Sequence, residues 1–287
     1  MNTAKVSVER GLFNYRFGGN EAGFPVVALH GWPESSFCWE GVARHLDSRF
    51  RLIAPDLRGL GDSERTLDPS LYLKEALARD MVEVIDALGI GDFFLVGHDW
   101  GGIVAQEVAI ACPERVKKLV IMNIPVITNA RGNREAREVI NSWGGLPHWY
   151  QYFQQQPGLA EAMIKGNEEV WVSYFFGRAG REGRIPREAI DEYVRCYKIE
   201  HTPQTAAFYY RAMRHDYARW EMLAGKKFPM PTLYIYGEKD VVIIPQYLNH
   251  LEEVFNSIQV VRFEASHFVQ EEEPEKVAAA MNAFFLS

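Results

Sequence analysis

Gly97-His98-Asp99-Trp100-Gly101-Gly102 links an apolar run over residues 92–97 to a helical pattern that extends from 103 to 111. The run is typical of a buried strand, so the stretch predicts a sharp strand–turn–helix connection. Glycines permit the tight turn, and a Gly-x-nucleophile-x-Gly turn, here called the elbow motif, holds its central side chain above the end of the strand. That side chain is the carboxylate of Asp99, and the N-terminus of the following helix favours its ionised form. We therefore interpret Asp99 as a nucleophile; the alternative is a surface turn in which Asp99 only caps the helix.

An acid and a base follow the nucleophile in the order expected of a hydrolytic triad. Tyr236-Gly237-Glu238-Lys239-Asp240 ends a predicted strand and offers Asp240 as the acid. Glu264-Ala265-Ser266-His267-Phe268 follows the last predicted strand and offers His267 as the base. A turn-forming aspartate and a loop histidine are the alternative interpretations. The three positions share one context, the carboxyl end of a strand, which favours the triad.

Strand and helix patterns alternate on both sides of the turn. Amphipathic patterns predict helices over 71–88 and 274–285. Apolar runs predict further strands over 25–30, 51–56, 118–123, 231–236 and 258–263. From about 126 to 227 the pattern is helical and rich in aromatic residues. We predict an α/β fold with a mostly parallel sheet and helices on both faces, its core domain formed by 1–125 and 228–287. Residues 126–227 form an all-helical cap inserted between two strands, over the carboxyl ends where such sheets bind ligands.

The composition argues against several classes of partner and cofactor. A net charge of -7 gives no electrostatic support for nucleic-acid binding. No run is long and apolar enough to span a bilayer, and residues 1–10 lack the pattern of a secretory signal, so we expect no membrane partner and a cytoplasmic protein. The three cysteines, Cys38, Cys112 and Cys196, have neither metal-ligand spacing nor a disulfide framework. We expect no metal and no organic cofactor, and either a monomer or a homodimer.

A carboxylate nucleophile restricts the chemistry. Attack of Asp99 on an ester would give an anhydride, whereas attack on a saturated carbon displaces a leaving group and forms an alkyl ester on the enzyme. His267 can then activate a water to attack the carbonyl carbon of Asp99. The backbone N–H groups of Trp32 and Trp100 are the candidate oxyanion-hole donors for that second step. The expected substrate is a small apolar molecule with an electrophilic sp³ carbon, an epoxide or an alkyl halide.

Over nearly its whole length the sequence resembles the epoxide hydrolase and haloalkane dehalogenase branch of the α/β-hydrolases. His30-Gly31-Trp32-Pro33 is similar to the family's His-Gly-x-Pro motif, whose x residue supplies an oxyanion-hole N–H, and the resemblance implies a cis bond before the proline. The loop over 56–63 resembles a stretch of the superfamily that indicates fold, not substrate. Asn123 stands where some relatives carry the acid. Its amide cannot serve as one, so the role falls to Asp240.

Two cap segments resemble soluble epoxide hydrolases, in which a pair of tyrosines binds the epoxide oxygen and protonates the alkoxide. The segment over 150–162 matches the first without a gap if Tyr150 has this role; a gap of one residue would select Tyr152 instead. Tyr209-Tyr210-Arg211-Ala212-Met213 resembles the second segment and selects Tyr210. The alternative for both tyrosines is packing on amphipathic cap helices. The resemblance therefore predicts an epoxide hydrolase in which both tyrosines bind substrate.

Three other activities fit parts of this pattern. A haloalkane dehalogenase would share the triad and bind a halide through Trp100, which contacts the substrate in either case, but matched tyrosines have no clear use there. A haloacetate dehalogenase of the fluoroacetate type would carry one arginine directly after the nucleophile and another shortly after it, where this chain has Trp100 and Ile103. A non-catalytic binding protein of the same fold remains an alternative, although such proteins usually lose a triad member.

Overall fold

One sheet of eight strands runs through the computed structural model, which describes residues 1–287. The strands lie side by side in the order β1-β2-β4-β3-β5-β6-β7-β8. Their bounds are β1 Asn2–Val8, β2 Gly11–Gly19, β3 Phe24–Leu29, β4 Phe50–Pro55, β5 Phe93–His98, β6 Val116–Met122, β7 Thr232–Gly237 and β8 Ile258–Phe263. From β4 to β8 every neighbouring pair is parallel, which confirms the predicted mostly parallel sheet.

The N-terminal hairpin of β1 and β2 was not among the predicted strands. The two strands pair in antiparallel fashion, and β2 is also antiparallel to its other neighbour, β4. No residue of β1 is buried, so its sequence lacks the continuous apolar run that marks the central strands. The buried strands β3 and β5, which carry such runs, were predicted to within one residue at each end.

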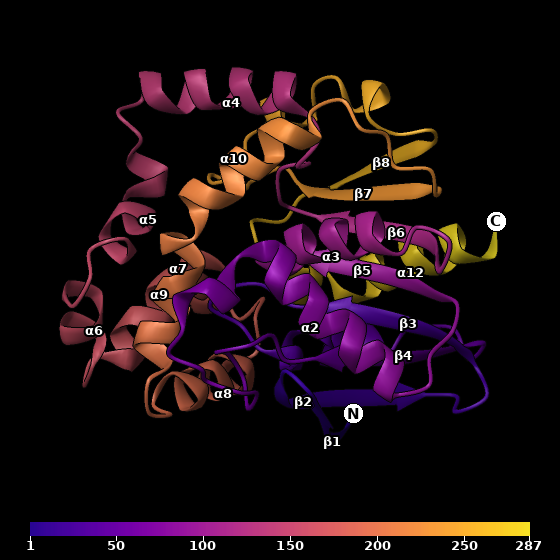
Figure 1. Cartoon of the computed structure of the whole chain (residues 1–287), viewed down its shortest axis with the longest axis horizontal. Helices are drawn as coiled ribbons and strands as arrows, with labels where there is room; N and C mark the ends of the chain where they lie inside the picture. Colours follow the sequence, from indigo (N-terminus) through magenta and orange to yellow (C-terminus); the bar gives the residue numbers. More distant parts are fainter.

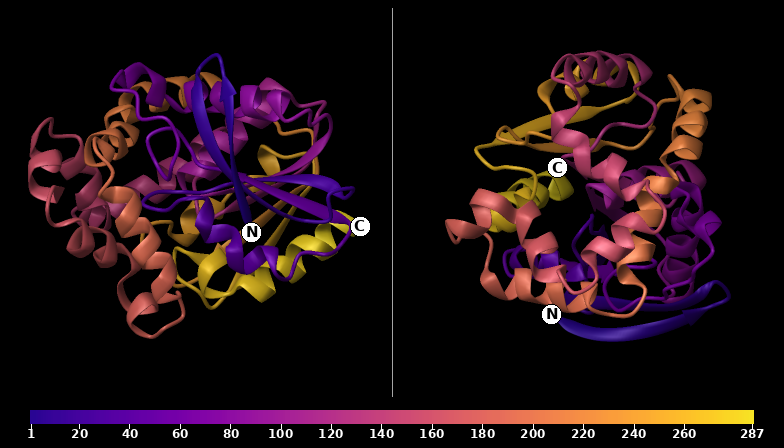
Figure 2. Two further views of the ribbon diagram at one scale, coloured as in Figure 1. Left: turned by 90° about the horizontal axis from the view of Figure 1, so that it is seen from below. Right: turned by 90° about the vertical axis from the view of Figure 1, so that its left-hand side faces the viewer.

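Helices cover both faces of the sheet, as predicted (Figure 2). One face carries α2 Lys74–Ala87 and α3 Trp100–Ala111; the other carries α1 Glu40–Ala43, α11 Val269–Glu272 and α12 Pro274–Leu286. Helix α2 begins later than the predicted residue 71, because Pro69–Tyr72 form a separate 3₁₀ turn capped by Asp68. Further 3₁₀ turns are Ser36–Trp39, Leu146–His148, Pro245–Leu248 and Leu251–Glu253. No helix combines the length and the apolar character needed to cross a bilayer.

Between β6 and β7, which are neighbours in the sheet, the chain forms helices and no strand. They are α4 Ala130–Ser142, α5 Trp149–Gln154, α6 Leu159–Ile164, α7 Glu168–Arg181, α8 Arg187–Tyr197, α9 Thr202–Arg211 and α10 Met213–Leu223, here called the cap helices. Figure 1 shows most of them gathered beyond one end of the strands rather than spread over the faces of the sheet. A cavity lies between the cap helices and the carboxyl ends of the core strands, and Asp99, in the turn after β5, lines it.

Candidate active site

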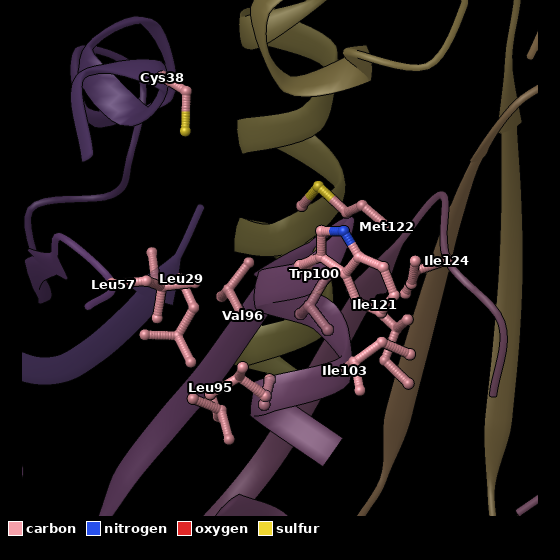
Figure 3. Packing of buried hydrophobic residues seen from close by; sticks show 14 of the residues in the cluster. Leu29, Cys38, Leu57, Leu95, Val96, Trp100, Ile103, Ile121, Met122 and Ile124 are labelled. Carbon is pink, nitrogen blue, oxygen red and sulfur yellow. The ribbon is translucent and has the colours of Figure 1, made fainter. Parts of the chain in front are cut away.

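Asp99 lies at the junction of β5 and α3 with φ 49° and ψ -131°. A positive φ is uncommon for a residue with a side chain, so the surrounding packing must hold this conformation. A Cβ on Gly101 would meet the backbone of Leu29 and His30, and one on Gly97 would meet the backbone of Gly101, which is why the turn needs both glycines. Figure 3 shows the apolar side chains of β5, β6 and α3 that pack around the turn.

The predicted triad is assembled around this turn. His267 Nε2 lies 3.4 Å from Asp99 Oδ2, and His267 Nδ1 lies 2.7 Å from Asp240 Oδ2. The other oxygen of Asp240 accepts hydrogen bonds from the backbone N–H groups of Val242 and Ile243, at 2.7 and 3.1 Å. Asp240 is thus fixed at one edge of the imidazole, and the opposite edge faces the nucleophile.

Burial and charge act in opposite directions on the triad. Burial lowers the pKa of His267, but the Asp240 and Asp99 carboxylates outweigh it and raise that pKa well above its ordinary value. Burial likewise opposes ionisation of Asp99, but the hydrogen bond and the charge of His267 bring its pKa below the ordinary value. Both shifts favour the charged forms, an Asp99 carboxylate beside an imidazolium of His267.

The candidate oxyanion donors lie next to Asp99. The backbone N–H of Trp32 donates to Asp99 Oδ1 at 2.8 Å, so this oxygen and the one facing His267 are different. Trp100 is the first residue of α3, and its N–H makes no hydrogen bond with another protein group. The bond between Trp32 and Pro33 is cis, as predicted.

The cap brings two tyrosines together above Asp99. The ring centres of Tyr150 on α5 and Tyr210 on α9 are 5.6 Å apart, and Trp32 stacks on Tyr150 at 5.5 Å. Both side chains are buried, whereas Tyr152 is 61% exposed, so burial favours Tyr150 over the alternative with a gap. Burial raises the pKa of both phenols, and the charge of Asp99 raises it further. Both are therefore neutral hydroxyls that can donate a proton.

Two cavities meet at the nucleophile. The larger, of about 470 Å³, is lined by Asp99, Trp100, Tyr150 and Tyr210 at one end and extends between cap helices α4 and α10. The smaller, of about 120 Å³, is lined by Trp32, Asp99, Tyr150 and His267. Asp99 and Tyr150 line both cavities, whereas Tyr210 lines only the larger and His267 only the smaller.

A buried polar network behind His267 was missed by the sequence analysis. His98, inside the elbow motif, has Nε2 2.8 Å from the carbonyl oxygen of His267 and Nδ1 2.9 Å from Glu34 Oε2. Burial raises the pKa of Glu34 to about 8 and lowers that of His98 to about 4, so both are neutral. A carbonyl only accepts, so the His98 proton sits on Nε2, and Nδ1 accepts from the Glu34 acid. Glu34, just after the His-Gly-x-Pro motif, was the available signal.

Asn123 also has a role that the sequence analysis did not assign. Its amide nitrogen donates to the carbonyls of Ser266 and His267 at 2.9 and 3.0 Å, and its oxygen accepts from the N–H of Gly237 at 2.8 Å. The residue after β6 therefore joins the loop that carries the acid to the loop that carries the base. Asn123 thus holds the loops of Asp240 and His267 together.

Known proteins resemble this chain over most of its length. A family model described as alpha/beta hydrolase fold matches residues 25–274. Epoxide hydrolase 3 of Siraitia grosvenorii is 30% identical over 302 residues, covering 90% of this chain and 90% of that protein, and Epoxide hydrolase 4 of Mus musculus is 27% identical over 291 residues, covering 96% and 77%. A mutant epoxide hydrolase from Bacillus megaterium, solved with its diol product, has a TM-score of 0.86 at 26% identity, covering 99% of this chain and 100% of that one. The chain is a member of the α/β-hydrolase fold family, in the branch that contains the epoxide hydrolases.

Proposed function

We propose that this protein hydrolyses epoxides to vicinal diols through an ester on Asp99. The observation that carries the proposal is the pair of buried phenols of Tyr150 and Tyr210 beside the carboxylate, 5.6 Å apart between ring centres. An epoxide oxygen stays attached to its carbon chain when the ring opens and becomes a strongly basic alkoxide. Neutral phenols can both hydrogen-bond this oxygen and supply its proton.

In the first half-reaction, an oxygen of Asp99 attacks a ring carbon, the C–O bond of the epoxide breaks, and the alkoxide takes a proton from a cap tyrosine. The ester no longer carries the Asp99 charge, so one of the two carboxylates that raise the pKa of His267 is gone. The pKa of His267 falls, and its proton restores the phenol. The step thus consumes the resting ion pair and leaves a neutral imidazole.

In the second half-reaction, the neutral His267 takes a proton from water, and the resulting hydroxide attacks the carbonyl carbon of Asp99. The Trp32 N–H, 2.8 Å from Asp99 Oδ1, and the adjacent Trp100 N–H are the donors for the charge that develops there. Collapse breaks the ester bond, and the leaving alkoxide takes the second proton of the water. The products are the diol, the Asp99 carboxylate and protonated His267, so the cycle closes.

The experiment traps the ester. We expect His267→Gln protein, incubated with styrene oxide, to gain the mass of one epoxide on the peptide that contains Asp99, because alkylation proceeds and hydrolysis does not. Asp99→Asn protein treated in the same way is the control and stays unmodified. Diol formation by wild-type protein with no adduct in the His267 variant would contradict the two-step mechanism. Turnover of 1-chlorobutane in place of every epoxide offered would favour the dehalogenase alternative.

A further inference from the structure

A cap residue and a core residue form an ion pair beside the loop that carries His267. Arg184 lies between α7 and α8 of the cap, and its guanidinium pairs with the carboxylate of Glu272, the last residue of α11 in the core. The Glu272 side chain has no exposed surface, and no other basic group lies within 4.0 Å of its carboxylate. An ionised carboxylate without a partner is costly to bury, so the charge on Glu272 depends on Arg184.

The same carboxylate holds the residue that precedes the base. Its second oxygen accepts a hydrogen bond from the backbone N–H of Ser266 at 3.0 Å and another from the Ser266 hydroxyl. Hydrogen bonds to an ionised carboxylate are shorter and roughly twice as strong as those to a neutral acceptor. Glu272 therefore holds the backbone at Ser266 most firmly when it is ionised.

Three side chains hold the backbone of Ser266 and His267. Asn123 donates to the two carbonyls at 2.9 and 3.0 Å, His98 donates to the carbonyl of His267 at 2.8 Å, and Glu272 accepts from the N–H of Ser266. All three belong to the core. Glu272 is the one that a cap residue binds, so part of the support for the base depends on the cap.

The same segment of the cap also contacts the residue on the other side of the base. Phe176 of α7 packs on Phe268, which directly follows His267; the ring centres are 4.5 Å apart, and both side chains are buried. The backbone N–H of Arg184 donates to the carbonyl of Ala179 at 2.9 Å, which fixes Arg184 to the end of α7. The cap thus reaches the loop of the base at two points, one on each side of the histidine.

We propose that Arg184 is a positioning residue for His267 and that it acts through Glu272 and Ser266. Its kinetic consequence rests on the proposed function. Hydrolysis of the ester requires a water within hydrogen-bond reach of His267 that also faces the carbonyl carbon of Asp99, so this step is sensitive to small displacements of the imidazole. Formation of the ester depends more on the cap tyrosines. Loss of the Arg184 guanidinium therefore slows the second step more than the first.

Single-turnover kinetics with styrene oxide compare the two steps. We expect Arg184→Gln to slow hydrolysis of the ester about tenfold, the effect of weakening a hydrogen bond to a charged group, and to change its formation by less than about twofold. Arg184→Lys should recover part of the loss, because it keeps the charge. Arg178→Gln is the matched control, since Arg178 is an exposed arginine of α7 that pairs with Glu182 of the same segment rather than with the core.

A double-mutant cycle distinguishes this route from a general loosening of the cap. Glu272→Gln keeps the shape of the side chain and removes its charge, so it should slow ester hydrolysis as much as Arg184→Gln does. The double variant should be no slower than either single variant, because both changes remove the same interaction. Additive effects, equal slowing of both steps, or an equal effect of Arg178→Gln would overturn the proposal. If Arg184→Gln does not fold, Glu272→Gln is measured alone, and wild-type hydrolysis of the ester in that variant would overturn it.

Proton NMR of His267 separates this inference from the proposed activity. The Nδ1 proton, donated to Asp240 at 2.7 Å, exchanges with water when the ring moves away from that carboxylate. We expect this exchange to be about tenfold faster in Arg184→Gln than in the wild type and unchanged in Arg178→Gln. If no epoxide is turned over but this difference is observed, the proposed activity fails and the positioning role stands. Exchange at the wild-type rate in Arg184→Gln would overturn the positioning role.

Discussion

The ammonium group of Lys74 lies 4.2 Å from the centre of the Trp100 ring, and Trp100 is the residue that follows Asp99. Lys74 is fully buried at the start of α2 and pairs with Asp216 of α10 at 2.8 Å. It also donates to the carbonyl of Tyr209, next to the cap tyrosine Tyr210, at 2.6 Å. One side chain of the core thus contacts Trp100 and connects it to α9 and α10, two of the cap helices that line the large cavity.

Lys74→Met should therefore destabilise the protein by about 3 to 5 kcal/mol, since removal of one partner leaves the Asp216 charge buried without compensation. Chemical denaturation of the purified variant measures this loss. Lys74→Met combined with Asp216→Leu should recover much of it, because the uncompensated charge is removed as well. Equal stability of the single variant and the wild type would contradict a charged, buried pair at this position.

The neutral state of Glu34 has a consequence for stability that depends on pH. Its pKa in the folded protein is raised to about 8 by burial, whereas the unfolded chain has the ordinary value of 4.5. The folded state therefore binds more protons between these values, so the stability that this group contributes is full below pH 4.5 and is lost as the pH rises through about 8.

Glu34→Gln tests this dependence. The amide can donate to His98 Nδ1 as the neutral acid does, but it cannot ionise. We expect the wild type to lose more stability than the variant between pH 5 and pH 8, by about 1 to 3 kcal/mol. Urea denaturation at both pH values gives the comparison. Parallel stability curves for the two proteins would mean that Glu34 is ionised in the folded state.

Asp240 should act mainly on the second half-reaction. It accepts from His267 Nδ1 at 2.7 Å and stabilises the imidazolium that forms when water is deprotonated. Asp240→Asn is expected to slow hydrolysis of the ester by about 10³- to 10⁴-fold, more than it slows formation of the ester. The ester then accumulates during turnover, and intact-protein mass spectrometry detects it. A variant that slows only alkylation would assign the orienting role to another residue.

The sequence predicted the central strands, the helical insertion and the residues that meet at Asp99, because each depends on a local pattern. Continuous apolar runs mark strands that are buried on both faces, and the elbow motif fixes its own backbone. The exposed strand β1 has no such pattern, and the place of Glu34 after the His-Gly-x-Pro motif does not show which side chains it meets. The contact between His98 and Glu34 joins side chains that are 64 residues apart in the chain. Contacts of this kind depend on how the folded chain packs, and the spacing of residues in the sequence does not show them.

The cap tyrosines provide the prediction that separates epoxide opening from dehalogenation. Tyr150→Phe and Tyr210→Phe should each keep the fold, because the rings and their packing on Trp32 remain. Each change removes one donor to the developing alkoxide, and the alkylation rate should fall by on the order of a hundredfold for each. The double variant should lose nearly all alkylation, while hydrolysis of an ester already formed is much less affected because it depends on His267 and the oxyanion hole.

Rapid-quench kinetics with styrene oxide measures the two steps in the four proteins, and Tyr152→Phe is the control, since that phenol is 61% exposed. We expect the Tyr152 variant to alkylate at the rate of the wild type. A halide leaves as an anion that needs no proton, so a dehalogenase would retain turnover of its haloalkane in both phenylalanine variants. Full activity of the double variant on epoxides would show that the alkoxide obtains its proton elsewhere, and the proposed role of the tyrosine pair would be wrong.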